Sequence, residues 1–342
     1  MIKILTATND KALNAGPKAK MDIINFLKES GIDKIESEMV YLVNSSNESK
    51  KNPLSNKIKN LGNRVKLVIK NVFCKDYILI QYPLITNIKI FNLLPKKNTI
   101  ILIHDLQGIR TQSKELEEKE INILKKFPCI IVHNKSMEEY LKGKGVKSNF
   151  IDLEIFDYKV NGEVKNDEEK SQNIVYVGNL KKIKTPFLYQ LDESKMNFKI
   201  NLYGIGIEND INTKLLYKGS YQPDELPKKI NGRLGLVWDG NYDESDENIG
   251  FKNYLRYNNP HKLSCYISAG IPVIVWEKSA VANFVRKKNI GYTINSIYDI
   301  NNIDFSDYNS KIENVKIISK KVKDGFYIKK AIKEAIKVLG NR

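Results

Sequence analysis

The chain has 342 residues, of which 42% are hydrophobic and 9% aromatic, and its formal net charge at pH 7 is +16. This composition can supply the cores of two ordinary domains, and it excludes a disordered chain. The three cysteines lie far apart in the sequence. Their spacing excludes a metal site built from their thiolates and favours a reducing compartment such as the cytoplasm.

The positive charge suits three kinds of partner, namely nucleic acid, an anionic membrane surface and phosphate-bearing ligands. Lysine greatly outnumbers arginine, and no run alternates basic residues with stacking aromatic ones. Proteins that read bases favour arginine, because its guanidinium makes paired hydrogen bonds, so we expect no nucleic-acid partner. The abundance of Lys, Asn and Ile also indicates an AT-rich genome, which accounts for part of the excess charge.

The N-terminal segment MIKILTATND is typical of a strand and a turn rather than a signal peptide. No apolar run has the length that a membrane span needs. We therefore expect a cytoplasmic protein, with a peripheral contact at the inner face of the membrane left open by the basic charge.

The first half alternates short apolar runs with amphipathic stretches, which is the pattern of an α/β fold. A loop through Gly16-Pro17 precedes a helix predicted over 18–30, and a later helix begins at Ser136, which has capping-box spacing with Glu139. Continuous β-rich runs are typical of parallel strands buried on both faces. The strands expected here cover residues 2–6, 77–81, 99–104 and 128–132.

The polar, charged stretch 157–172 indicates a linker, and a second α/β unit follows it. Its strands are expected at 173–178, 197–204, 234–238 and 272–276. Residues 314–339 are predicted to be helical and are strongly basic. We therefore predict two Rossmann-like domains that face a cleft, with ligands at the carboxyl ends of the strands. The domains cover residues 1–157 and 158–321, and a C-terminal helix over 322–342 packs back on the first.

The segment 258–276, NNPHKLSCYISAGIPVIVW, has the organisation of an anion site. Pro260 suits a first helical position, and Asn259 before it can cap the exposed amides of a helix that begins at His261. The positive end of that helix and Lys262 together favour a diphosphate. The alternative is an ordinary capped helix, which explains the apolar residues but not the clustered Asn, His and Lys.

Two loops of the second half carry weaker signals. Gly178 and Gly240 each follow a strand-like run, where glycine lets a backbone approach a ligand or simply forms a turn. Lys181 and Lys182 come directly after the first strand of this half, so they either contact phosphate or form a solvated edge.

The string PHKLSCYISAGIPVIV, with LGLVWDG upstream and ANFVRKKNIGYTI downstream, resembles a bacterial glycosyltransferase family. That family includes the glucosyltransferases that extend O-linked GlcNAc on serine-rich-repeat adhesins and the β-1,6-galactofuranosyltransferases of polysaccharide assembly. The segments AGPKAKMDI, QYP and HD of the first half are similar to the galactofuranosyltransferase branch. The resemblance covers most of the chain and implies a GT-B fold, a UDP-sugar donor and transfer of galactofuranose or glucose to a glycan hydroxyl.

Matching positions carry the family's residues onto this sequence. The family's lysine that faces the UDP diphosphate corresponds to Lys262, and its basic loop residue corresponds to Lys181 or Lys182. The loops at Tyr217 and Asp239 correspond to the edge of the nucleotide pocket. The implied UDP-sugar-binding residues are Gly178, Asn179, Lys181, Lys182, Tyr217, Asp239, Gly240, Asn259, Pro260, His261, Lys262 and Ser264.

In the first half, the expected acceptor domain, His104 and Asp105 end a buried strand and are candidate bases for the acceptor hydroxyl. The alternative is that His104 caps the strand and Asp105 caps the next helix. His133 ends the following strand and is interpreted as structural. Gly16 and Lys18 either form an acceptor-side loop or an ordinary helix start.

No acidic pair stands at a strand end in metal-holding form, and the acidic residues 243–247 have the setting of a loop. Amides and basic side chains would hold the leaving diphosphate, so no metal or cofactor is expected. The expected partners are the donor and a glycan, glycoprotein or lipid-linked acceptor, and the resemblance also implies a second copy of the chain in a homo-oligomer. Two alternatives stay open: a noncatalytic UDP-sugar-binding partner subunit and a GT-B-fold epimerase.

Overall fold

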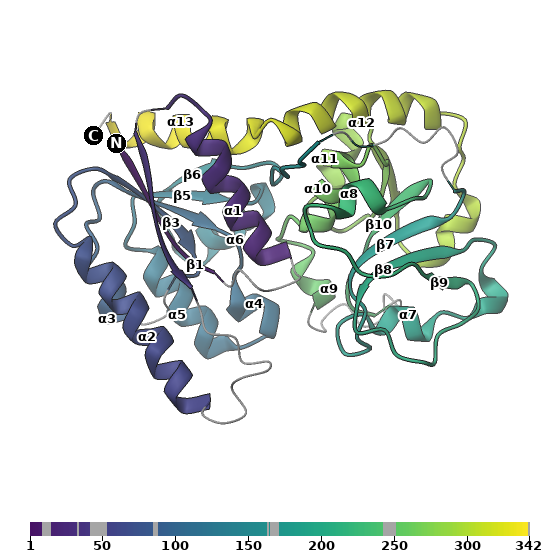
Figure 1. Ribbon diagram of the computed structural model, residues 1–342, viewed down its shortest axis with the longest axis horizontal. Helices are drawn as coiled ribbons and strands as arrows, with labels where there is room; N and C mark the ends of the chain where they lie inside the picture. Colours follow the sequence, from purple (N-terminus) through teal and green to yellow (C-terminus); the bar gives the residue numbers. More distant parts are fainter. Residues whose placement is uncertain are drawn as a thin grey trace. The chain divides into compact units, whose positions relative to one another are not determined.

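The computed structural model describes residues 1–8, 15–32, 34–41, 53–84, 88–162, 164, 171–241 and 251–340 (Figure 1). The chain forms two compact units, each built on a parallel β-sheet with helices, which confirms the predicted α/β class. It passes from the first unit to the second at Leu153–Glu154 and returns to the first at Phe326–Tyr327. From the sequence we expect these changes after residues 157 and 321.

The sheet of the first unit has six parallel strands in the order β2-β1-β3-β4-β5-β6. The strands are β1 (Ile2–Thr8), β2 (Ile35–Tyr41), β3 (Tyr77–Tyr82), β4 (Thr99–Ile103), β5 (Cys129–Val132) and β6 (Asn149–Asp152). β4 is buried along its whole length, as its continuous apolar sequence predicts. β2 and β3 lie on opposite sides of β1, so the connections diverge there and create a switch point at the carboxyl ends of β1 and β3.

Helices connect these strands, and α13 joins them from the C-terminal end of the chain. They are α1 (Ala15–Lys28), α2 (Pro53–Lys70), α3 (Ile88–Phe91), α4 (Gln107–Thr111), α5 (Lys114–Leu124), α6 (Lys135–Gly143) and α13 (Phe326–Gly340). α3 contacts both α2 and α5, so these three helices cover one face of the sheet. The ammonium of Lys329 in α13 lies over the ring of Phe26 in α1, so α13 packs beside α1.

Two predicted helix starts are wrong in detail. α1 begins at Ala15, so Gly16 and Pro17 lie in its first turn and not in a loop. Proline costs nothing there, because the first amides of a helix have no partner within it. α6 begins one residue before Ser136, and its cap is Asn134, whose side chain accepts a hydrogen bond from the Met137 amide at 3.0 Å.

The single C-terminal helix that the sequence predicts is two helices in the structure. α12 (Tyr308–Lys323) has Asp324 as its C-cap, and α13 begins two residues after that cap. Gly325 between them has φ of 69°, a left-handed conformation that glycine adopts without steric cost. The expected helix over 322–342 therefore corresponds to the end of α12, a turn and α13.

The sheet of the second unit also has six parallel strands, in the order β12-β11-β10-β7-β8-β9. The strands are β7 (Ile174–Asn179), β8 (Ile200–Ile205), β9 (Leu215–Tyr217), β10 (Leu234–Val237), β11 (Val273–Trp276) and β12 (Gly291–Ile294). The remaining elements are α7 (Pro186–Gln190), α8 (Leu226–Lys229), α9 (Phe251–Tyr254), α10 (His261–Ser268), α11 (Ala282–Lys288), α12, η1 (Glu193–Lys195) and η2 (Ile297–Asn302). Here the connections diverge at β7, so its switch point lies beside β10.

α10 packs directly on this switch point. A Cβ at Gly235 would lie 2.3 Å from the ring of Tyr266, so only glycine allows this helix to approach β10 so closely. The hydroxyl of Tyr266 accepts a hydrogen bond from the Val177 amide and donates one to the Leu236 carbonyl. These two bonds hold α10 against both β7 and β10, which fixes the position of its first turn.

Among the residues that the structure describes, no helix combines the length and the apolar character that crossing a bilayer requires.

Candidate active site

Lys262, in the first turn of α10, is held at the carboxyl ends of β7 and β10. Its ammonium donates hydrogen bonds to Asp239 Oδ1 at 2.7 Å and to the Trp238 carbonyl at 2.9 Å. A third bond, of 2.9 Å, goes to the hydroxyl of Tyr176, whose ring centroid lies 4.4 Å from the ammonium. The structure thus brings together two of the expected residues, Lys262 and Asp239, at the switch point of the sheet.

Tyr176 is a member of this cluster that sequence reasoning missed. Its side chain is fully buried, and burial raises the pKa of its hydroxyl well above the usual value, with the negative charge of Asp239 adding to the effect. The neutral hydroxyl donates toward the Trp238 carbonyl and Asp239 while it accepts from Lys262. The only signal in the sequence is a tyrosine inside the otherwise apolar run NIVYVG.

The predicted cap of α10 is wrong. The residue at the N-cap position is Pro260, with an extended backbone (φ −66°, ψ 132°), and it supplies no side-chain capping hydrogen bond. Asn259 is buried and its amide instead donates to the Glu154 carbonyl at 2.9 Å. The first amides of α10 are therefore not covered by the side chain that the sequence assigned to them.

His261 and Ser264 hold the segment that leads into the second unit. The ring of His261 stacks on Phe156 with 4.7 Å between centroids, and the buried Ser264 hydroxyl donates to the Phe156 carbonyl at 2.6 Å. Together with the bond from Asn259, these contacts anchor residues 154–156 to α10. Their observed role is to fix the helix whose first turn carries Lys262.

The two lysines of the basic loop after β7, Lys181 and Lys182, have different partners. The side chain of Asn179 accepts a hydrogen bond from the Lys181 amide at 3.0 Å and shapes the turn. The Lys182 amide donates to Glu208, and its ammonium lies 3.4 Å from Asp210. Lys181 is exposed and pairs with no carboxylate in the described part of the chain, so it is the more available of the two for an anion.

Glycines pack the ends of β7 and β8 together. Gly178 and Gly204 are register partners with φ of 149° and 150°, and a Cβ on Gly204 would lie 1.8 Å from the Gly178 carbonyl oxygen. The hydroxyl of Tyr217 donates to the Gly204 carbonyl at 3.0 Å, which places that tyrosine beside the pair. Gly240 follows Asp239 with φ of 78°, and its carbonyl accepts from the Phe187 amide.

In the first unit, His104 follows β4 and is oriented by a residue of β3. Its Nε2 lies 2.8 Å from Gln81 Oε1, and Gln81 Nε2 donates to the Lys20 carbonyl at 3.1 Å. Because the amide nitrogen of Gln81 faces a carbonyl, its oxygen faces His104, so Nε2 of His104 carries the proton. Nδ1 is then the basic nitrogen of the imidazole.

Asp105 forms an ion pair with Arg110. Its Oδ2 accepts hydrogen bonds from the Arg110 guanidinium and from the Gln107 side chain. The N-cap of α4 is Leu106, without a side-chain hydrogen bond, so the alternative that Asp105 caps this helix is wrong. Two side chains of α4 therefore engage the Asp105 carboxylate, whereas the His104 imidazole contacts Gln81 of β3.

Two further ionisable groups of the first unit are Lys20, which is half-buried, and Glu120, which is buried. The Lys20 ammonium donates to the Ala7 carbonyl at 2.7 Å, and burial lowers its pKa to about 8, with Arg64 acting in the same direction and Asp105 against it. Burial raises the pKa of Glu120 to about 7, although its carboxylate accepts from the amides of Gln107 and Gly108.

The side chains of two other residues of the first unit, His133 and Lys18, are buried. Nε2 of His133 lies 3.0 Å from the Ile103 carbonyl, and complete burial lowers its pKa to about 4, as a structural histidine requires. Lys18 is buried and its ammonium contacts both oxygens of Asp22 at 2.5 and 2.7 Å. Gly16 is exposed, and both residues lie at the start of α1, so the structure shows the second of the two alternatives, a helix start.

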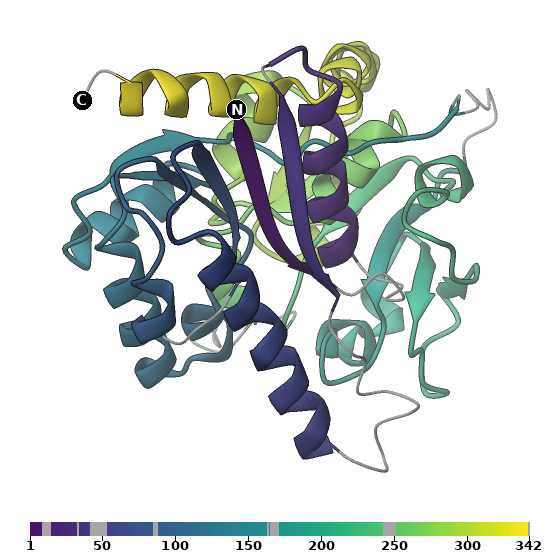
Figure 2. The same cartoon turned by 60° about the vertical axis from the view of Figure 1, so that its left-hand side comes forward.

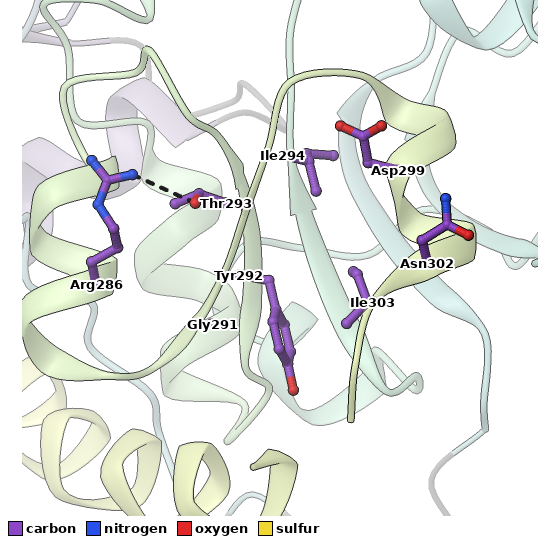
Figure 3. A pocket seen from close by; sticks show the side chains of 8 residues that line it. All are labelled: Arg286, Gly291, Tyr292, Thr293, Ile294, Asp299, Asn302 and Ile303. Atoms are coloured by element: carbon purple, nitrogen blue, oxygen red, sulfur yellow. Dashed lines mark hydrogen bonds between the residues drawn. The ribbon is translucent and has the colours of Figure 1, made fainter. Parts of the chain in front are cut away.

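The edge strand β12 borders a separate hollow (Figure 3). Its polar groups are bonded to neighbours: Arg286 to Thr293 at 3.5 Å, and Asp299 to the amides of Asn295 and Ser296. None of its lining residues belongs to the Lys262 cluster. The described residues contain no group of three or more His, Cys, Asp or Glu that could hold a metal, and the acidic tract 243–247 lies outside them.

Comparison with known proteins places the chain in a family. The model of the glucosyltransferase 3-like N-terminal domain matches residues 2–155, and that of the C-terminal domain matches residues 174–335. The β-1,6-galactofuranosyltransferase WbbI of Escherichia coli K12 is 32% identical over 281 residues, which cover 78% of this chain and 81% of that protein. Glucosyltransferase 3 of Streptococcus gordonii is 22% identical over 335 residues, 93% of each chain.

Solved structures support the fold. HepE of Anabaena, in complex with UDP and glucose, aligns over 98% of this chain and 100% of its own with a TM-score of 0.58 and 12% identity. WaaG, a glycosyltransferase of lipopolysaccharide biosynthesis, aligns over 99% and 100% with a TM-score of 0.51 and 10% identity. Together with the two parallel sheets, these matches show the two-domain GT-B fold. The chain belongs to the glucosyltransferase 3-like family and is a glycosyltransferase.

Proposed function

We propose that this enzyme transfers a hexosyl unit, galactofuranose or glucose, from a UDP-sugar to a glycan hydroxyl during assembly of a cell-surface polysaccharide or glycoprotein. The observation that carries the proposal is Lys262, fixed by Tyr176 and Asp239 in the first turn of α10. The names of the relatives WbbI and glucosyltransferase 3, and the UDP-glucose complex of HepE, support the donor class.

The second unit is proposed to hold the donor. As the bond between the sugar C1 and the diphosphate oxygen breaks, negative charge grows on the leaving UDP. Lys262 and the first amides of α10 stabilise that charge, because a helix N-terminus and an ammonium both favour anions. Asp239 holds the lysine in place before the donor binds, and Lys181 in the loop after β7 adds a second cation.

The first unit is proposed to activate the acceptor. The acceptor oxygen attacks C1 of the sugar, and its proton passes to a base as the new bond forms. His104 suits this role better than Asp105, because Gln81 orients its imidazole through Nε2 at the end of β4. The carboxylate of Asp105 is already engaged in an ion pair with Arg110.

A donor screen tests the proposal. Each UDP-hexose is offered to the protein alone and with sugar acceptors, and both UDP release and glycan product are measured. Product that forms only when acceptor is present supports transfer. Conversion of the donor without acceptor would identify an epimerase, and a UDP-dependent rise in melting temperature without any turnover would identify a noncatalytic partner subunit.

A further inference from the structure

α2 presents a continuous stripe of exposed apolar side chains. Ile58, Leu61 and Ile69 are 64%, 45% and 57% exposed, and Phe73, three residues beyond the end of the helix, is 92% exposed. With the half-buried Val65, these residues recur every three or four positions, so they share one side of the helix. Scattered exposed apolar residues are ordinary, but an aligned row marks an interaction surface.

This stripe is not the side by which α2 packs on its own unit. Leu67, Val68 and Asn71 are buried and form the face that holds the helix to the first unit. The side chain of Asn71, just beyond the end of the helix, also donates a hydrogen bond to the Leu67 carbonyl at 2.9 Å, which stabilises the last turn. The two ribbon views place α2 at the outside of the first unit (Figures 1 and 2). The exposed row is therefore an additional apolar face on a helix that is already anchored.

The charge of α2 has a single sign. Its sequence contains no acidic residue, and its basic residues are Lys57, Lys59, Arg64, Lys66 and Lys70. Lys59 and Lys66 are exposed and make no ion pair with any residue that the structure describes. Lys70 lies 3.2 Å from Glu38 of β2. An apolar row flanked by lysines is the pattern of a helix that lies in the interface of an anionic membrane.

We propose that α2 and Phe73 dock on an anionic lipid surface, with the apolar row inserted among the lipids and the lysines on their headgroups. A second copy of the chain fits less well, because a twofold interface would place these lysines beside their own copies. The proposal goes beyond hexosyl transfer and does not depend on it.

The C-terminal helix is the other basic candidate for such a contact, but it lacks an exposed apolar row. Tyr327, Ile328 and Ile332 of α13 are buried, which leaves Lys330, Lys333 and Lys337 on its exposed side. Phe326 at the start of α13 is 43% exposed, but no aligned row of exposed apolar side chains follows it among the described residues. This helix therefore supplies a matched control for the test of α2.

The test measures co-sedimentation of the full-length protein with sucrose-loaded vesicles, either of phosphatidylcholine alone or with added phosphatidylglycerol. We expect binding to the anionic vesicles that exceeds binding to neutral ones. The variants Ile69→Ser/Phe73→Ser and Lys59→Glu/Lys66→Glu should each weaken the partition coefficient at least about tenfold. All four side chains are exposed, so folding should be unaffected, and melting curves check this.

Two control variants test whether vesicle binding depends on the apolar row and lysines of α2 or on any exposed lysine or apolar side chain of the protein. Lys333→Glu/Lys337→Glu makes the same charge change on α13, and Ile183→Ser removes an apolar side chain that is 80% exposed in the second unit. Both controls should bind like the wild type. Equal binding of wild type and α2 variants, loss in the α13 control, or dissociation of an oligomer by the α2 variants would each overturn the proposal. Donor consumption without vesicles tests the transferase separately.

Discussion

Each of the two sheets has a lysine at its switch point, but the surroundings of these lysines differ. In the second unit, Lys262 is bonded to a carboxylate, a neutral phenol and a carbonyl. In the first unit, Lys20 is bonded to the carbonyl of Ala7, and burial lowers its pKa to about 8. Lys262 therefore faces a carboxylate, whereas Lys20 faces a backbone carbonyl and has a pKa that burial lowers.

The difference suits two separate tasks. A lysine that a carboxylate holds in position can turn to a diphosphate without first being desolvated. In the first unit, burial lowers the pKa of Lys20 and raises that of Glu120, and Gln81 orients the imidazole of His104. The two proposed sites, one for the donor and one for the acceptor, are thus each placed at the switch point of a parallel sheet.

Replacing Lys262 should have the largest effect. Lys262→Ala leaves Asp239 facing the diphosphate without its partner, so we expect at least about a hundredfold loss in kcat/KM for the donor. The UDP-dependent rise in melting temperature should also disappear. The exposed Lys333 of α13 gives the control, since Lys333→Ala should change neither quantity. Unchanged UDP binding by Lys262→Ala would count directly against the anion site.

Replacing His104 should affect the acceptor step proposed for the first unit but not the UDP binding proposed for the second. We expect His104→Gln to slow transfer to the acceptor about a hundredfold, because a positioned base contributes roughly that factor, and to leave UDP binding intact. Single-turnover transfer and UDP titration measure the two effects. Normal transfer by this variant would remove His104 as the base.

Glu120 makes the stability of the first unit depend on pH. Its pKa is raised to about 7 in the folded protein, so its stabilising contribution is complete below the unfolded value of 4.5 and is lost as the pH rises through 7. Glu120→Gln should therefore gain about 3 kcal/mol relative to the wild type between pH 4.5 and 8. Denaturant unfolding across this range checks the difference. A difference in unfolding free energy that stays constant over this pH range would show that burial does not raise the pKa of the Glu120 carboxyl group.

Tyr176→Phe should have a smaller effect. It removes the hydroxyl that accepts from Lys262 but leaves the bonds to Asp239 and Trp238, so we expect about fivefold weaker UDP binding. Tyr298→Phe in η2 removes an exposed hydroxyl that accepts from the Asp192 amide and should have no effect on UDP binding. An equal loss in both variants would mean that Tyr176 acts only through folding.

Metal removal should have the smallest effect. The proposed donor site neutralises the diphosphate with Lys262 and the start of α10, so transfer should proceed at the same rate after dialysis against EDTA. Rates are compared before dialysis, after it and with Mg²⁺ restored. A transfer rate that falls after dialysis and recovers with Mg²⁺ would show that Lys262 and the start of α10 do not suffice to neutralise the diphosphate.

The sequence predicts most of the central strands, because parallel strands buried on both faces appear as continuous apolar runs. The edge strand β2, IESEMVY, and the short edge strand β9, LLY, escaped prediction, since edge strands mix polar residues or are too short to show a pattern. The break at Gly325 was missed because the helical periodicity continues on both sides of it.

The site was predicted only in part. The helix start and Lys262 follow from local sequence, and the structure places both at the switch point. The cap failed because Asn259 bonds to Glu154, more than a hundred positions away, and no local rule shows such a tertiary contact. Tyr176 and Gln81 were missed for a related reason, because each is a buried polar residue in a strand whose partner comes from another element.

The most direct test of the account is a crystal structure of the protein with UDP. We expect the diphosphate oxygens within hydrogen-bonding distance of the Lys262 ammonium and of the first amides of α10. Phosphates bound elsewhere, with Lys262 still bonded to Asp239, would contradict the central claim.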